Sequence, residues 1–129
     1  MLFRSPGFSY IDFIYGAHYC LNFVTEPEGR AAAVLLRAAE PVEGIEIMRA
    51  RSTSTKINRL LNGPGKFCRA FGLNREQNNL DLTGGILYLE DRSFRVAEIG
   101  TSARIGIRTA TDRPWRFYDK NAASVSRTG

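Results

Sequence analysis

The sequence contains little cysteine and histidine, the residues on which most zinc sites and disulfide frameworks depend. Its 129 residues include two cysteines, Cys20 and Cys68, and one histidine, His18. The cysteines lie far apart without the paired spacing of metal ligands, so no zinc site can be assembled from them convincingly. We therefore expect no metal and no other cofactor, and we expect both cysteines to be reduced thiols in the core.

Long hydrophobic runs are also missing. No stretch reaches the roughly 18 apolar residues that a membrane-spanning helix requires, and the first residues lack the basic and apolar regions of a signal peptide. We expect no membrane partner. The expected location is the cytoplasm, in association with the nucleoid, or the nucleus if the source is a eukaryote.

An ordinary globular composition with an excess of positive charge is present instead. Hydrophobic residues make up 43% and charged residues 24% of the chain, which argues against disorder and against a coiled coil. No repeat or linker divides the chain, and its length suits one domain with a real core. Lys plus Arg outnumber Asp plus Glu by 18 to 13, for a net charge of +5. This balance fits a protein that meets polyanions, and it also fits charge that serves solubility.

The first part of the chain predicts strands. Aromatic and branched side chains fill Phe8 to Val24, and the run breaks near Tyr15-Gly16, which predicts a β-hairpin. After a turn at Glu26-Pro27-Glu28-Gly29, the apolar residues of Ala31 to Arg37 predict a short buried strand.

The middle of the chain predicts helices. Pro41 opens a segment with acidic residues early and basic residues late, which is typical of a helix. Lys56 to Leu61 predicts a further turn of helix, which Asn62-Gly63-Pro64-Gly65 interrupts. Helical spacing then resumes over Lys66 to Leu73.

The last part predicts a return to strands. Asn74 to Gly85 is polar with two glycines and predicts an exposed loop. Strands are predicted over Ile86–Leu89, Ala103–Ile107 and Trp115–Tyr118, and Asn121–Gly129 predicts a tail. Predicted strands thus come both before and after the predicted helices, and we expect a single domain over residues 1–129.

Five motifs, ordered along the chain, carry a resemblance to a known family. The first is Tyr-Gly-x-x-x-Cys-x-Asn over residues 15–22. The others are Val34-Leu35-Leu36-Arg37-Ala38-x-Glu40-Pro41-x-Glu43-Gly44, Gly63-Pro64-Gly65-Lys66-x-Cys68, Ala103-Arg104-Ile105-Gly106-Ile107 and Pro114-Trp115-Arg116-Phe117-Tyr118. From about Pro6 to Arg127 the chain resembles the alkyladenine DNA glycosylases, also called 3-methyladenine or methylpurine DNA glycosylases.

The resemblance implies a fold and a reaction. The fold is mixed α/β, of the α+β class, and is built round a curved antiparallel sheet with a protruding hairpin and a few flanking helices. The reaction is monofunctional hydrolysis of the N-glycosidic bond of alkylated or deaminated purines in double-stranded DNA, which begins base-excision repair. It uses neither a metal nor another cofactor, and we expect a monomer.

The resemblance also implies a missing part. In the family, the position of Pro6-Gly7 is preceded by a segment that carries a water-activating glutamate, and that segment has no counterpart here. We therefore expect a domain truncated at its N-terminus, with little or no glycosylase activity from this chain alone.

The end of the hairpin is implied to contact DNA. An enzyme that acts on a base must turn it out of the duplex, which requires a side chain that wedges into the gap. Tyr15 matches the wedge, and Gly16, Ala17 and His18 match positions next to it. Two alternatives stay open, because Tyr15 can fold back on its hairpin and His18 can serve as a packing residue.

Lys66 is a further candidate for a DNA contact. Gly63-Pro64-Gly65-Lys66 is not a Walker motif, which would need glycine at position 60 and Ser or Thr at position 67, where this chain has Leu60 and Phe67. A helix start with Lys66 could still hold a DNA phosphate. An ordinary turn that leads into a helix is equally compatible with these residues.

Asn22 and Asp12 match positions of the family's base pocket. The asparagine discriminates between bases in the family, whereas from local sequence alone Asn22 is a strand-end residue that bonds the backbone. Asp12 departs from the family, which usually has an aromatic residue there to stack on the flipped base. A stacking contact is worth roughly 1–3 kcal/mol per base, so we expect Asp12 to weaken base capture.

Arg37 and Ile105 match the positions that hold the hydrolytic water. Arg37 ends an apolar strand, where a charge needs an anionic partner or solvent. In the family the matching arginine acts beside the catalytic glutamate, together with the backbone carbonyl at the position of Ile105. These two residues are the candidate catalytic residues of this chain, and the general base is absent.

Basic residues of the last part of the chain suit contacts to DNA phosphates, and any of them can instead be solvated: Arg104, Arg108, Arg113 and Arg116. Two alternatives to a glycosylase stay open. One is a non-catalytic module that binds damaged DNA, and the other is a fold whose basic charge serves solubility.

Overall fold

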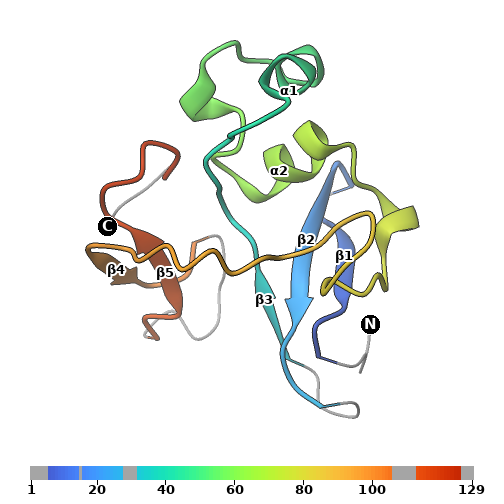
Figure 1. Ribbon diagram of the computed structural model, residues 1–129, viewed down its shortest axis with the longest axis vertical. Coiled ribbons are helices and arrows are strands. Elements are labelled where there is room, and N and C mark those ends of the chain that lie inside the picture. Colours follow the sequence, from blue (N-terminus) through green and yellow to red (C-terminus); the bar gives the residue numbers. More distant parts are fainter. Residues whose placement is uncertain (1–5, 15, 28–31, 106–112, 126–129) are drawn as a thin grey trace.

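The computed structural model describes residues 6–14, 16–27, 32–105 and 113–125. These residues form two short α-helices and two antiparallel sheets, one of three strands and one of two (Figure 1). The α+β prediction is confirmed. The antiparallel sheet that the resemblance implied is present, and among the described residues the strands near the C-terminus form a second, two-stranded antiparallel sheet.

The hairpin predicted over Phe8 to Val24 is present. Strand β1 (Ser9–Ile14) pairs antiparallel with β2 (His18–Val24), with Ile14 opposite His18 at the closed end and Ser9 opposite Phe23 at the open end. Gly16 lies in the turn with φ 63°, a left-handed conformation that glycine adopts without steric cost.

The third strand is shorter and more exposed than predicted. Strand β3 (Ala33–Leu35) pairs with the outer side of β2, so the strand order is β1-β2-β3. Val34 is 54% exposed. The prediction of a buried strand is wrong for these residues because β3 has a strand neighbour on one side only, which suits an edge strand. Ala31 lies outside the described residues.

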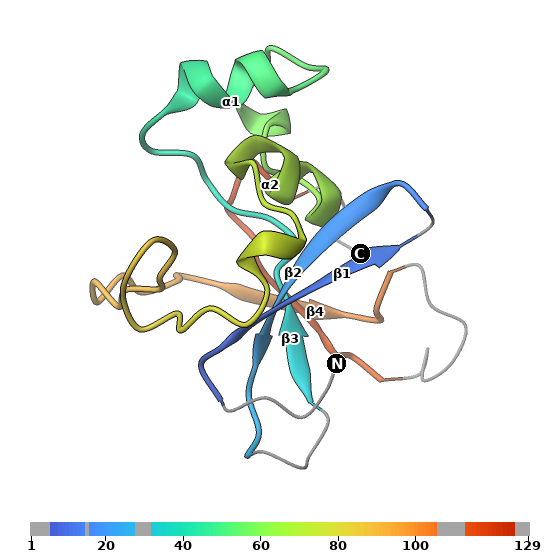
Figure 2. The ribbon, with the colours of Figure 1, turned by 90° about the vertical axis from the view of Figure 1, so that its right-hand side faces the viewer.

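The two helices gather at one end of the molecule (Figures 1 and 2). Helix α1 (Ile45–Arg51) has Glu46 in its first turn and arginines in its last, as predicted. Helix α2 (Pro64–Phe71) begins inside the predicted break. Proline has no N–H and a helix-like φ, so Pro64 fits the first helical position. The predicted extra turn is the 3₁₀ helix η1 (Ile57–Arg59).

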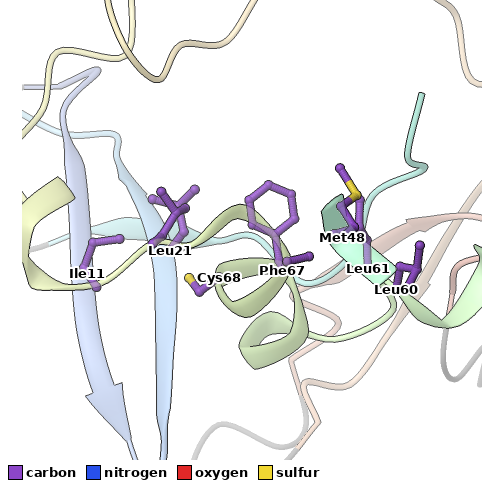
Figure 3. Packing of buried hydrophobic residues seen from close by; sticks show 9 residues of the cluster. Ile11, Leu21, Met48, Leu60, Leu61, Phe67 and Cys68 are labelled. Carbon is purple, nitrogen blue, oxygen red and sulfur yellow. The ribbon is translucent and has the colours of Figure 1, made fainter. Parts of the chain in front are cut away.

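The hydrophobic core lies where α2 packs against the hairpin (Figure 3). One face of the hairpin contributes Ile11 and Leu21, and α2 contributes Phe67 and Cys68. The other buried members of the core are Met48, Leu60, Leu61, Ala70 and Leu73. The core therefore fixes the hairpin relative to the helices.

The segment predicted as an exposed loop after Leu73 packs against β1. It holds the 3₁₀ helix η2 (Arg75–Gln77), and its Leu82 is 3% exposed. Asn78 Oδ1 accepts a hydrogen bond from the backbone N–H of Ile11, and Ser9 Oγ donates one to the carbonyl of Gln77. Most of the segment is an exposed loop, as predicted, but the prediction missed its packing against β1, whose free edge presents backbone groups that need partners.

The strand predicted over Ile86–Leu89 is absent. Ile86 is 92% exposed, and the N–H of Leu89 bonds the carbonyl of Leu82, with no strand as neighbour. Branched and apolar residues favour strands only where a neighbouring strand offers pairing and burial. The prediction failed because no such neighbour is supplied there.

The second sheet joins β4 (Ile99–Ser102) to β5 (Arg116–Asp119). The strand predicted over Trp115–Tyr118 is confirmed, whereas the one predicted over Ala103–Ile107 lies earlier. A Cβ at Gly100 would lie 2.4 Å from the ring of Tyr118, so only glycine permits this pairing. Ala103 to Ile105 follow β4, and residues 106 and 107 lie outside the described residues.

The C-terminal segment is less free than the predicted tail. Ser124 is buried, and its N–H donates a hydrogen bond to Glu40 Oε1 at 3.2 Å. The tail prediction is therefore wrong as far as Val125, and residues 126–129 lie outside the described residues.

Candidate nucleic-acid interface

The two faces of the hairpin are chemically different. Directly opposite residues of paired strands share a face, and the register pairs Tyr10 with Asn22 and Asp12 with Cys20. The opposite face carries Ile11 and Leu21 into the core. We call the face of Tyr10, Asp12, Cys20 and Asn22 the polar hairpin face, and it contains both residues predicted for a base pocket.

Asn22 is held by its own sheet. It is 9% exposed, and its side-chain Nδ2 donates hydrogen bonds to the carbonyls of Tyr10 at 3.2 Å and Cys20 at 3.4 Å. The backbone bonding that local sequence favoured is therefore present. Since these bonds use the amide nitrogen, they leave the side-chain oxygen as the group that can meet a ligand.

Asp12 is a half-buried carboxyl without a local partner. Its Oδ1 is buried and accepts no hydrogen bond from the residues that the structure describes. Burial raises the pKa of Asp12, because a charge is less stable away from water. Burial also raises the pKa of Tyr10, and the negative charge of Asp12 raises it further. Asp12 is therefore the negative group of the polar hairpin face.

Arg37 adds a positive charge to the same region. It follows β3 and is half-buried. Burial raises the pKa of Cys20, Asp12 raises it further, and the charge of Arg37 lowers it. An effect of this kind requires Arg37 to lie within electrostatic reach of Cys20. The fold thus brings Asp12, Asn22 and Arg37 together from three separate segments.

The other predicted catalytic residue lies elsewhere. Ile105 is in the short segment after β4, beyond the end of the two-stranded sheet, and not on the hairpin. Tyr15, the predicted wedge, lies outside the described residues. Its neighbours Gly16 and Ala17 are exposed, and the N–H of Ala17 bonds the carbonyl of Ile14 at 3.1 Å to close the turn.

His18 lies against Gly65, the residue before Lys66, where the hairpin end approaches the start of α2. A Cβ at Gly65 would lie 3.1 Å from three atoms of His18, so glycine is what allows the imidazole this close. His18 stays exposed on its outer side, which fits the packing alternative without removing the histidine from the surface. Lys66 is exposed, and its Nζ donates to Asn62 Oδ1 at 2.8 Å.

The helical end of the molecule is strongly cationic, a feature that the motif search missed. From Ile47 to Arg75 the chain has seven basic residues and no acidic one. Six of the seven are exposed, and we call them the cationic helical surface: Arg51, Lys56, Arg59, Lys66, Arg69 and Arg75. No two are adjacent in sequence, so a search for basic runs overlooks them, whereas counting charge by segment finds them.

Two further contacts tie this surface to the fold. Arg69 Nε donates to the carbonyl of Arg51 at 2.7 Å, which joins α2 to α1. The Arg75 guanidinium lies 5.7 Å from the centre of the Phe13 ring on β1. The cationic helical surface is therefore held in a defined position next to the hairpin.

The arginines predicted to contact phosphates near the C-terminus are placed differently. Arg116 is 5% exposed, its Nη1 donates to Ser102 Oγ at 3.1 Å, and its guanidinium lies over the Tyr118 ring. The phosphate prediction is wrong for Arg116, because a buried guanidinium cannot reach a polyanion. Arg104 and Arg113 are exposed, and Arg108 lies outside the described residues.

The described residues hold neither a candidate metal site nor a candidate membrane-spanning helix. They contain no group of three or more His, Cys, Asp and Glu side chains that could hold a metal ion. None of their helices has the length and apolar character needed to cross a membrane.

Comparisons with known proteins identify the relatives of this chain. A protein of Prosthecochloris aestuarii is 46% identical over 128 residues, which cover 98% of this chain and 62% of the relative. A protein of Desulfitobacterium hafniense is 43% identical over 137 residues, which cover 98% of this chain and 68% of the relative. A protein of Methanocella arvoryzae is 46% identical over 132 residues, which cover 98% of this chain and 66% of the relative. The name of each describes a candidate 3-methyladenine DNA glycosylase.

The chain therefore spans between about three fifths and two thirds of the length of these relatives. A family model described as Methylpurine-DNA glycosylase (MPG) matches residues 1–123, almost the whole chain. This match agrees with the similarity to the three relatives and with the resemblance carried by the five motifs. The chain belongs to the methylpurine-DNA glycosylase family.

Proposed function

We propose that this chain forms the DNA-binding and base-binding part of a monofunctional DNA glycosylase. The enzyme would hydrolyse the N-glycosidic bond of alkylated or deaminated purines in double-stranded DNA. The proposal rests on the observation that Asp12, Asn22 and Arg37 lie near one another at one hairpin face, in a chain of this family. We further propose that it acts as a monomer in the cytoplasm, at the nucleoid, or in the nucleus of a eukaryote.

The proposed interface has two parts. Tyr15, with Gly16 and Ala17, would enter the duplex and fill the space that the flipped nucleotide leaves. His18 and Lys66, with the cationic helical surface beside them, would contact the phosphates on either side. An exposed hairpin end held against a cationic helix start supports this arrangement.

The proposed chemistry is direct hydrolysis. A water oxygen attacks the anomeric carbon, the bond to the purine nitrogen breaks, and a general base accepts the water proton. Arg37 and the carbonyl of Ile105 would position this water, and Asn22 would contact the purine edge with its free oxygen. No glutamate of this chain matches the family's water-activating glutamate, so we propose that excision requires a glutamate from outside these 129 residues.

The test compares two proteins on the same substrates. Duplexes that contain hypoxanthine or 3-methyladenine are incubated with this chain and with a version extended upstream in the source gene. We expect base release by the extended version only. We also expect both proteins to bind the damaged duplexes, and Tyr15→Ala to weaken that binding while Tyr88→Ala, at an exposed tyrosine of the loop before β4, does not.

The alternative function predicts a different pattern. If neither protein releases a base while both bind damaged DNA in a Tyr15-dependent way, a non-catalytic binding module replaces the glycosylase. If neither protein binds DNA at all, the basic charge serves solubility and both proposals fail.

A further inference from the structure

We propose that Asp12 makes the base site selective for purines that carry a positive charge. The ligand class is purines alkylated on a ring nitrogen, in preference to neutral deaminated purines such as hypoxanthine. The inference rests on the proposed function and deepens it, since it assigns a specificity-determining residue of the same site.

If the polar hairpin face binds the purine, as the proposed function has it, the Asp12 carboxyl lies on the binding face. Asp12 and Asn22 share the polar hairpin face, on neighbouring strands, and their residue pairs are two positions apart in the register. Oδ1 of Asp12 is buried, yet no described residue gives it a hydrogen bond, and none of the described ion pairs includes it. A buried carboxylate in this condition is stabilised by whatever cation or N–H donor binds beside it.

The surrounding groups are mostly neutral near pH 7. Tyr10 on β1, Cys20 on β2 and Cys68 on α2 all have raised pKa values, which keeps them neutral near pH 7. Arg37, from the segment after β3, lowers the pKa of Cys20, whereas the pKa of Asp12 is raised by burial. Asp12 is thus the acidic group of the polar hairpin face, and the charge of Arg37 acts on Cys20 without lowering the pKa of Asp12.

Purine chemistry converts this charge into selectivity. Alkylation of N3 or N7 in a purine nucleotide leaves a fixed positive charge on the ring, whereas deamination of adenine gives a neutral ring. A partly buried carboxylate attracts the first ring and gains little from the second. The same carboxylate lacks the aromatic surface that would stack on both rings equally.

The experiment measures excision of both base classes by the protein from the complete source gene. The readout is the ratio of kcat/KM for 7-methylguanine to kcat/KM for hypoxanthine. We expect Asp12→Asn to lower this ratio by roughly tenfold, the size of one charge-assisted contact. Asp12→Glu keeps the charge and should keep most of the ratio, and Glu43→Gln, at an exposed carboxylate, should leave it unchanged.

A pH series separates charge from shape. As the pH falls towards and below the raised pKa of Asp12, the ratio of the unmodified protein should decline, and that of Asp12→Asn should not. His18, the exposed histidine near the closed end of the hairpin, is present in both proteins, so the comparison isolates the effect of Asp12.

The outcomes distinguish this inference from the proposed function. If the unmodified protein excises both bases and Asp12→Asn keeps the ratio within twofold, the inference is overturned and the function stands. If the unmodified protein excises neither base, the proposed function fails and the inference fails with it. Circular dichroism confirms that each variant is folded before its ratio is compared.

Discussion

Replacement of Asn22 tests whether the polar hairpin face is held by the bonds described above. Its Nδ2 donates to the carbonyls of Tyr10 and Cys20 from a position that is 9% exposed. Asn22→Ala removes both bonds, each with a net value of about 0.5–1.5 kcal/mol, so we expect a loss of about 1–3 kcal/mol. Urea unfolding followed by circular dichroism measures this change, and Asn58→Ala at an exposed site should stay within about 0.5 kcal/mol.

Asn22→Asp gives the sharper form of the same prediction. The side chain keeps its size, but a carboxylate now faces two carbonyl oxygens that need a donor. Above the pKa of the new carboxyl we expect this variant to be less stable than Asn22→Ala. Burial and the facing carbonyls raise that pKa in the folded state, so the folded protein binds the proton more tightly than the unfolded chain.

The stability of Asn22→Asp should therefore recover as the pH falls through the raised pKa, because the protonated carboxyl can donate a hydrogen bond again. Unfolding measured from pH 7 down to pH 4 follows this recovery. An Asp variant that is as stable as the Ala variant at pH 7, with no gain at lower pH, would refute the hydrogen-bonding role of Asn22.

Three further predictions concern the packing that supports the site. Leu60→Ala empties a fully buried position and should lower the free energy of unfolding in urea by about 2–5 kcal/mol. Ile57→Ala, at a residue that is 45% exposed, should lower it by less than about 1 kcal/mol. Equal losses for the two variants would contradict the described core. Gly65→Ala places a Cβ 3.1 Å from His18, so it should displace the imidazole and lower the affinity for DNA severalfold, as measured by fluorescence anisotropy. An unchanged affinity would show that the contact between Gly65 and His18 does not contribute to DNA binding. Cys68 has a pKa raised by burial to about 12, so it should resist thiol reagents at pH 8 until urea unfolds the chain; rapid labelling of the native protein would show that it is not buried.

Local patterns in the sequence were sufficient where one segment sets its own structure. The run of aromatic and branched side chains with its break near Tyr15-Gly16 predicts the hairpin, and the charge order after Pro41 predicts α1. The same kind of pattern failed at Ile86–Leu89 because an apolar run can form a strand only beside another strand. It missed the packing of the segment after Leu73 because polar composition does not reveal that β1 needs backbone partners there.

The sequence by itself determined the family, through five ordered motifs, and with it the residue types of the candidate site. Only the tertiary structure decided which of these residues meet. Asp12, Asn22 and Arg37 come from different segments, and their approach depends on strand register and on the packing of α2 against β2. Register and packing are long-range properties, because a shift of one residue in pairing moves every side chain to the opposite face of the sheet.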